Sequence, residues 1–351
     1  MASENTSAPV SAGADSPEDF IPVRWPAEWE PHRATWLAWP HAPTTWPGHL
    51  AEAQAEYAEI IRALQGREAV ELLVRDAAME EDARKQLQRA GVDPERGLRF
   101  HRVPTNDSWL RDSGPIFAED EAGNRCALAF GFDAWGGKYP PWDLDDCVGA
   151  AVAATAGVAC EAPGFVLEGG SIDGDGVGTI LTTESCLLNP NRETPPRTRA
   201  QMEERLAHWL GARRVIWLAG GIEADDTDGH IDDCARFVAP GSVVAARADA
   251  GADQAILAEN RRRLLAAGLD VHDLPMPPVH RVGGETCPAS YANFYLANGA
   301  ALVPVFGAAS DERALAVLRD VLPGRDVIGV PCRTLVLGLG AIHCLSQQEP
   351  A

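Results

Sequence analysis

Residues 264–274 read Leu-Leu-Ala-Ala-Gly-Leu-Asp-Val-His-Asp-Leu, which is the end of a helical pattern, a glycine and then a short apolar run. Glycine in this place suits a left-handed helix cap. The same features recur at intervals of 54 to 66 residues, at Gly91, Gly157, Gly211 and Gly324. Each apolar run predicts a buried strand. The chain therefore repeats one supersecondary unit about five times.

A second, glycine-punctuated segment follows each predicted strand. These segments are 109–117, 166–173, 226–238, 290–298 and 337–346. Five units favour a closed ring, in which equivalent strand ends meet at the axis as they do in propellers. We therefore predict a five-bladed, pseudosymmetric α/β propeller in which residues far apart in sequence form one site. The alternative is an α/β domain without symmetry, in which the polar residues are scattered.

Composition bounds the class of protein. The 351 residues are 46% hydrophobic, and we expect one domain over residues 21–351 after a disordered, Ser-, Ala- and Pro-rich tail at 1–20. No secretory signal or membrane span is predicted. The eight cysteines lack the spacing of a zinc site or disulfide scaffold, which favours reduced thiols in the cytoplasm. A net charge of −21 argues against nucleic acid as a partner and draws cations toward a cleft.

Polar residues of reactive type stand in four of the second segments. Asp112 lies in Asp-Ser-Gly-Pro, which is also strong turn chemistry. Glu168 follows an apolar run and precedes two glycines, where a glutamate either caps a turn or points into a cavity. The Gly-Asp-Gly at 174–176 predicts a hairpin turn. Cys344 follows a glycine-rich stretch and His343, although an isolated cysteine is more often a small buried hydrophobe.

Residues 228–232 form an alternating Asp-x-His-x-Asp pattern. In a strand this pattern places Asp228, His230 and Asp232 on one face, as it also does in a strand that faces solvent. Carboxylates bind a guanidinium in bidentate fashion, and its poorly electrophilic carbon requires a strong nucleophile such as a thiolate. Cys344, His230, Asp112, Glu168 and Asp232 together therefore match a site that binds and cleaves a guanidinium.

Longer stretches carry a resemblance to a known family. They include Trp-Pro-Ala-Glu-Trp-Glu-Pro-His at 25–32, Asn-Asp-Ser-Trp-Leu-Arg-Asp-Ser-Gly-Pro at 106–115, Asp-Thr-Asp-Gly-His-Ile-Asp-Asp at 226–233 and Ile-His-Cys-Leu-Ser-Gln-Gln-Glu-Pro at 342–350. The chain resembles the agmatine deiminases and, more loosely, the bacterial peptidylarginine deiminases of the guanidine-modifying superfamily. The resemblance implies the pentein-type five-bladed propeller and a role in polyamine synthesis.

The resemblance also implies roles for single residues. Cys344 matches the nucleophile that forms a covalent amidino-cysteine intermediate, and His230 matches the general acid and base. Asp112 and Asp232 match the residues that hold the guanidinium, which Glu168 also binds while it assists proton transfer. Trp109 and Asp226 match positions that contact the chain or distal amine of the substrate. The sequence departs from the family at Ala341, where asparagine is typical, and at Leu339, which replaces a glycine.

The expected reaction is hydrolysis of agmatine, a small cationic guanidine, to N-carbamoylputrescine and ammonia, with no metal or organic cofactor. Deimination of peptidyl-arginine or free arginine is the alternative, and Arg111 and Arg236 are then candidates for binding the α-carboxylate. An amidinotransferase is not excluded. Readings from other classes are a non-catalytic propeller that binds a macromolecule and a metal site of His230, Asp232, Asp233 and Cys344. A homo-oligomer remains possible.

Overall fold

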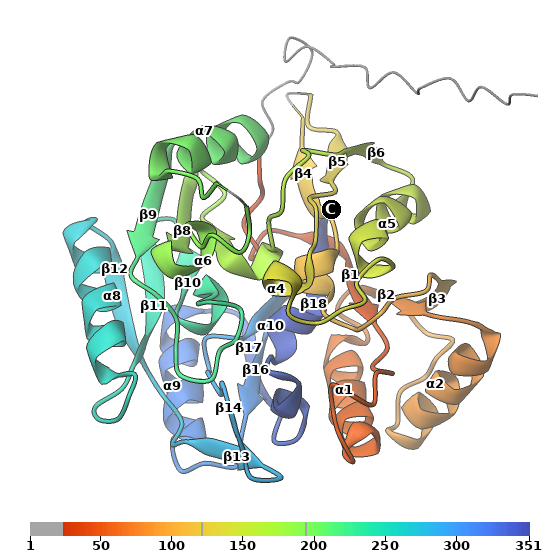
Figure 1. The fold of residues 1–351 in the computed structure, drawn as a ribbon. Helices are drawn as coiled ribbons and strands as arrows, with labels where there is room; N and C mark the ends of the chain where they lie inside the picture. The colour runs from red at the N-terminus through yellow and green to blue at the C-terminus, as the bar shows by residue number, and fades with distance from the viewer. Residues whose placement is uncertain (1–23, 121, 194) are drawn as a thin grey trace, which may run out of the picture.

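The computed structural model describes residues 24–120, 122–193 and 195–351. The tail predicted at residues 1–20 lies outside this range. The strands form five small open sheets and a separate two-stranded hairpin. Figure 1 shows the sheets around a common centre, with the longer helices on the outside. The predicted five-unit α/β propeller is confirmed.

Four of the sheets have the same three-stranded plan. The first strand pairs antiparallel with the second, and the second pairs in parallel with the third after a helical crossover. The strands in chain order are β4 (Ile116–Glu119), β5 (Arg125–Leu128) and β6 (Ala159–Glu161); β7 (Ile172–Gly174), β8 (Thr179–Thr183) and β9 (Arg214–Leu218); β10 (Ala235–Ala239), β11 (Ser242–Arg247) and β12 (Asp270–Pro275); and β15 (Tyr295–Ala297), β16 (Ala300–Val305) and β17 (Asp326–Pro331). The crossover helices are α5 (Val148–Ala156), α7 (Arg199–Leu210), α8 (Gln254–Ala266) and α9 (Asp311–Val321).

The fifth sheet joins the two ends of the described chain. Its order is β18 (Ser346–Pro350), β1 (His32–Ala38), β2 (Ala69–Val74) and β3 (Leu98–Arg102), and α1 (Leu50–Leu64) and α2 (Ala77–Arg89) are its crossovers. β18 pairs antiparallel with β1, so the last strand completes the unit that the first strand begins. This pairing closes the ring. The hairpin of β13 (His280–Val282) and β14 (Glu285–Cys287) is an addition to the repeat.

The glycine caps predicted from the repeat are confirmed. Gly157 and Gly211 are left-handed caps of α5 and α7, and the other three glycines also have positive φ values. The predicted hairpin turn after β7 is confirmed too. The expectation that every apolar run is a buried strand was wrong, because all three residues of β6 are exposed. β6, like the other third strands, pairs on one side only and lies at the edge of its sheet.

Tryptophans near the start of the described chain fill the region where the ring closes. Trp36, Trp39 and Trp46 are fully buried, while Trp25 and Trp29 are half-buried. Trp36 donates from Nε1 to Glu349 of β18, which ties the two chain ends together. Among the described helices, none is long and apolar enough to cross a membrane.

Short helical turns complete the fold. Four of them stand directly before the first strand of a sheet: α3 (Leu110–Ser113), η2 (Gly169–Ser171), η3 (Ile231–Asp233) and α10 (Ile342–Leu345). The others are η1 (Asp145–Cys147), η4 (Leu335–Gly338), α4 (Ala134–Gly137) and α6 (Glu184–Leu187). The first four occupy equivalent places in the repeat, and they carry the reactive residues.

Candidate active site

The propeller brings the reactive residues together from equivalent positions in different units. Asp112 lies in α3, Glu168 precedes η2, Asp232 lies in η3 and Cys344 lies in α10. His230 is the residue before η3. All five side chains are buried, so the convergence predicted from the sequence occurs inside the protein and away from bulk water.

Gly170 shows how closely three of these groups approach one another. A methyl group on Gly170 would lie 2.6 Å from His230 Nδ1, 2.9 Å from Asp112 Oδ1 and 3.2 Å from Asp232 Oδ2. Its backbone N–H donates to Asp112 Oδ1 at 2.9 Å. No other residue fits there without moving these side chains. The glycine pair after Glu168 therefore makes room for the site and does not form a phosphate loop.

The Cys344 sulfur faces carboxylates. Its Sγ lies 3.5 Å from Asp232 Oδ2 and accepts a hydrogen bond from Asn293 Nδ2 at 3.0 Å. Burial, together with the charges of Asp232 and Asp233, raises the pKa of the thiol well above its ordinary value. These surroundings favour the thiol form of Cys344, and a cation beside the sulfur would favour the thiolate.

Asn293 comes from the unit of β15, β16 and β17 and was missed in the sequence. It is fully buried and lies two residues before β15, as Cys344 lies two residues before β18. Its Oδ1 accepts the backbone N–H groups of His343 at 3.0 Å and Cys344 at 3.3 Å. The repeat itself was the signal, because residues 290–298 were recognised as an equivalent segment.

Asp112 is held by two donors in a strongly acidic setting. Besides Gly170 N–H, Trp135 Nε1 donates to its Oδ2 at 3.0 Å. Burial, Asp232 and Glu168 raise the pKa of Asp112 well above its usual range. Trp135 belongs to α4, a segment that the sequence analysis did not single out. It anchors that segment to the site.

Glu168 is paired on one side only. Arg192 Nε donates to Glu168 Oε1 at 2.6 Å, whereas Oε2 is buried and has no hydrogen-bond partner in the described part of the chain. Burial raises the pKa of Glu168 although Arg192 opposes the shift. Ligand atoms of Glu168, Cys186 and His230 lie within 4.8 Å of one another, as a metal site requires. The positive charge beside them is the Arg192 guanidinium, 3.9 Å from Cys186 Sγ.

His230 has a buried ring whose two nitrogens lack hydrogen-bond partners among the described residues. Its Nδ1 lies 3.8 Å from Asp112 Oδ1, beyond hydrogen-bond distance. Burial lowers the pKa of His230 to about 3, which leaves a neutral imidazole at physiological pH. A neutral imidazole in an acidic pocket can accept a proton from a thiol or a water.

The prediction that residues 228–232 form a strand was wrong. Asp228 and Gly229 have φ values of +69° and +103°, and residues 231–233 form η3. The turn places His230 and Asp232 in the site but sends the Asp228 carboxylate outward, to Lys138 and Arg192. Asp-Gly is a strong turn signal, and here it overrides the alternating pattern.

The two residues predicted to contact the remainder of the substrate lie in different settings. Asp226 is half-buried at the rim, where Tyr139 donates to its carboxylate. Trp109 is buried against Trp46, with ring centroids 5.7 Å apart. A methyl group on Gly340 would lie 2.6 Å from the Trp109 ring and 3.1 Å from Cys344 Sγ. Trp109 therefore packs behind the loop that carries the nucleophile.

The two departures from the family pattern lie in that loop. Leu339 has a φ of +71°, a conformation that glycine adopts more easily. Ala341 is the residue before α10 and is buried. The loop thus keeps a left-handed turn at position 339 although the glycine is absent.

Arg111 and Arg236 are internal residues. Both are buried and contact Glu28, at 3.3 Å and 2.9 Å, and Arg236 also contacts Asp173 at 2.8 Å. They are committed to these carboxylates and do not line an open site. These pairings disfavour them as ligands of a substrate carboxylate, the part they were given under the alternative of an arginine substrate.

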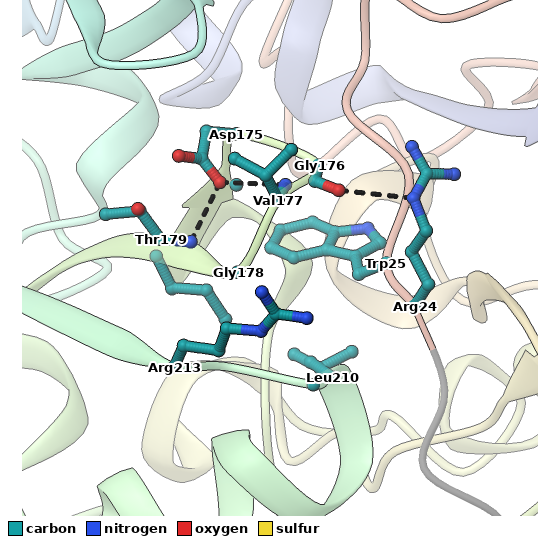
Figure 2. A pocket seen from close by; sticks show the side chains of 12 residues that line it. Arg24, Trp25, Asp175, Gly176, Val177, Gly178, Thr179, Leu210 and Arg213 are labelled. Carbon is teal, nitrogen blue, oxygen red and sulfur yellow. Dashed lines mark hydrogen bonds between the residues drawn. The ribbon is translucent and has the colours of Figure 1, made fainter.

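A large surface cavity lies elsewhere. Figure 2 shows a pocket of about 470 Å³ between the β7–β8 turn and the end of α7, lined among others by Arg24, Trp25 and Arg213. None of the reactive residues described above lines it. The candidate active site is instead the group of converging side chains at the propeller axis.

A thiol, a neutral imidazole and several carboxylates at the axis of five α/β units define a cysteine-dependent enzyme that binds a cation. Comparison with known proteins identifies the family. The chain belongs to the family of Porphyromonas-type peptidyl-arginine deiminases, whose model matches residues 24–350.

Individual relatives agree with this assignment. The agmatine deiminase of Stutzerimonas stutzeri is 38% identical over 93% of this chain and 95% of its own. The structure of Enterococcus faecalis agmatine deiminase matches with a TM-score of 0.87 and 31% identity, over 98% of this chain and 99% of that chain. A Cys-to-Ser variant of C. jejuni agmatine deiminase, solved with substrate bound, matches with a TM-score of 0.86 and 29% identity over 94% and 96% of the two chains.

Proposed function

We infer that the protein is a hydrolase that deiminates agmatine. The observation that carries this inference is a set of buried polar atoms without partners around Cys344. His230 Nδ1 and Nε2, Glu168 Oε2 and Asp232 Oδ1 all lack hydrogen bonds among the described residues. Unpaired buried polar atoms are costly and imply a ligand that supplies the missing bonds. A guanidinium supplies N–H donors in one plane, together with a positive charge.

Asp112 and Asp232 hold the guanidinium in this proposal, with Glu168 as a third acceptor. Burial raises the pKa values of Asp112 and Glu168, and for Asp112 the charges of Asp232 and Glu168 add to the shift. A bound cation relieves this repulsion and favours their ionised forms. It also favours the thiolate of Cys344 at the carbon that is to be attacked.

The first half of the reaction forms the covalent intermediate. His230 accepts the thiol proton, and the Cys344 sulfur forms a bond to the guanidinium carbon. His230 then protonates one amino group, whose bond to the carbon breaks to release ammonia. Asn293 Nδ2, which already contacts the sulfur, steadies the thiolate before attack.

The second half consumes water. His230, again neutral, removes a proton as the water oxygen bonds to the thiouronium carbon. The carbon–sulfur bond then breaks, the sulfur regains a proton, and N-carbamoylputrescine leaves. Neither half requires a redox change.

Agmatine fits better than arginine because of the charges around the site. The distal amine of agmatine is a cation, and the half-buried Asp226 carboxylate at the rim suits it. The α-carboxylate of arginine needs a cation instead, and Arg111 and Arg236 are engaged with Glu28 inside the protein. We further propose a cytoplasmic location, with which eight unpaired cysteines agree.

The test is ammonia release from the purified protein with agmatine, free arginine and an arginine-containing peptide, compared by kcat/KM. We expect agmatine to exceed both by at least about 100-fold, because a negative group of the substrate beside the Asp226 carboxylate would cost several kcal/mol. A preference for arginine or peptide would refute the proposed substrate. Amidino transfer to an added amine in place of hydrolysis would refute the reaction type.

A further inference from the structure

His343 has contacts that a neutral histidine cannot satisfy. It is buried one residue before Cys344, and the reaction above gives it no part. Its Nδ1 lies 2.7 Å from Asp232 Oδ2, and its Nε2 lies 2.8 Å from Glu28 Oε2. Ionised carboxylates only accept hydrogen bonds, and a neutral imidazole has one N–H group. Both contacts are hydrogen bonds only if the ring carries two protons or one carboxyl is protonated.

The surroundings of the two carboxylates decide between these possibilities. Glu28 Oε1 lies 2.9 Å from Arg236 Nη2 and accepts the backbone N–H of Leu296 at 2.8 Å. Burial opposes the shift, but Arg236 and His343 lower the pKa of Glu28 well below its ordinary value. Burial also opposes the shift at Asp232, but the contact with His343 lowers the pKa of that carboxyl. The other groups that contact Glu28 are all hydrogen-bond donors, so Glu28 is ionised, and with Asp232 ionised as well both ring nitrogens of His343 carry protons.

The charges of the buried cluster balance only with that proton. Glu28, Asp173 and Asp232 are its three anions. Arg111 and Arg236 are two cations, and a protonated His343 is the third. A neutral His343 would leave one buried carboxylate without an opposite charge, which is strongly unfavourable.

We propose that His343 is an imidazolium that acts as a positioning residue, tying Asp232 to Glu28 so that the Asp232 carboxylate stays ionised and correctly turned. The inference rests on the proposed function, in which Asp232 binds the guanidinium. Asp232 Oδ2 is fixed between His343 Nδ1 and Cys344 Sγ. Its Oδ1 has no hydrogen-bond partner among the residues that the structure describes and is left for the substrate.

The cluster is shielded from solvent on the side away from Cys344. A cavity of only about 10 Å³ lies against Glu28, Arg111 and His343, and Trp25 lines it. Trp25 also lines the surface pocket of Figure 2. The indole therefore separates the charge cluster from the open pocket, and the low dielectric behind it strengthens each ion pair.

Two substitutions separate positioning from simple packing. In His343→Asn the side-chain amide nitrogen falls near the place of Nδ1 and keeps a donor for Asp232. In His343→Gln it falls near Nε2 and keeps the donor for Glu28. We expect kcat/KM to fall at least about 100-fold in His343→Gln and no more than about tenfold in His343→Asn. Only His343→Gln loses the hydrogen bond to the charged Asp232 carboxylate.

Melting temperatures of the two variants provide the folding control, since each keeps one polar contact and loses the other. Equal losses of activity, or a larger loss in His343→Asn, would overturn the positioning role. If kcat/KM falls only in the variant with the lower melting temperature, the positioning role is overturned as well, because the loss of activity then follows folding and not the contact with Asp232.

The protonation state is tested without activity. Nitrogen NMR of the full chain, without substrate, at about pH 8 should show both His343 ring nitrogens bearing protons, where an ordinary histidine is neutral. The signal is assigned by its loss in His343→Asn. The groups that act on the ring are Asp232 of η3, Glu28 before β1, Arg236 of β10, Arg111 of α3 and the neighbouring Cys344. A spectrum with only one protonated ring nitrogen would overturn the proposal even if agmatine is the substrate. A spectrum with two protonated ring nitrogens would support the imidazolium even if agmatine is not the substrate.

Discussion

The two sides of Asp232 are built in opposite ways. On the side of Cys344 and His230, buried polar atoms lack partners, and the pKa values of the thiol and of Asp112 are raised. On the side of His343, Glu28 and Arg236, ion pairs of 2.7 to 2.9 Å connect the groups and the pKa of Glu28 is lowered. Burial is nearly complete on both sides.

The difference shows that burial alone does not identify a functional group. On the side of His343 each carboxylate is met by a cation, whereas on the side of Cys344 several buried polar atoms have no hydrogen-bond partner among the described residues, so that a ligand can supply one. The side of Cys344 and His230, here called the open side, binds the cation in the proposed reaction. The side of His343, Glu28 and Arg236, here called the closed side, orients the carboxylate that holds this cation. Substitutions on the two sides should therefore have different signatures.

The largest effect is expected on the open side, at the nucleophile. Cys344→Ala should lower kcat for agmatine by about a million-fold, as the loss of a catalytic nucleophile does elsewhere. Agmatine binding should remain, because the carboxylates that hold the guanidinium are unchanged. Turnover by ammonia release and affinity by calorimetry measure the two quantities.

Cys332→Ala is the matched control, because Cys332 is a fully buried thiol in the hydrophobic core between β17 and η4. It should retain activity with at most a modest loss of stability. If Cys344→Ala kept turnover, or if both variants lost it equally, the open side would not contain the nucleophile.

An intermediate effect is expected from changing the charge beside the sulfur. Burial and the Asp232 charge raise the pKa of Cys344, so alkylation by iodoacetamide should be slow at neutral pH and still accelerate above about pH 9. Asp232→Asn removes a negative neighbour, lowers the pKa and should speed alkylation at neutral pH about tenfold, the effect of one pKa unit. Peptide mass spectrometry distinguishes Cys344 from the exposed Cys147 and Cys160.

Asn293→Ala should shift the same profile the other way. The amide of Asn293 donates to the sulfur and lowers its pKa, so its loss should slow alkylation at neutral pH. If the two variants shift the profile in the same direction, access to the sulfur and not its charge environment controls the reaction.

The sequence predicted the open side better than the closed side. Repeat spacing led to the ring, and the ring brought Cys344, His230, Asp112, Glu168 and Asp232 together, because equivalent positions of a propeller face its axis. Asn293 was accessible by the same argument and was missed because an amide is not a reactive group. The strand predicted at residues 228–232 failed because alternation cannot reveal the positive φ of Asp228.

The closed side could not be predicted from the repeat. Glu28 precedes β1 and belongs to no equivalent segment, and its partners Arg111 and Arg236 come from other units. Only the three-dimensional arrangement shows that these three residues and His343 form one charge cluster. In the sequence alone, the acidic residues near Arg111 and Arg236 were compatible with a role in substrate binding as well as with a structural role.

The smallest effect is expected outside both sides, in the surface pocket of Figure 2. Arg213 is exposed and lines that pocket, and no reactive residue of the axis lines it. Arg213→Ala should leave kcat/KM for agmatine within about twofold and the unfolding free energy within about 0.5 kcal/mol, as most surface substitutions do. Because a surface cavity of about 470 Å³ could hold a small substrate, the variant compares this cavity directly with the unpaired buried atoms of the axis as a guide to function. A loss comparable with that of Cys344→Ala would mean that volume was the better guide and that the axis is scaffold throughout.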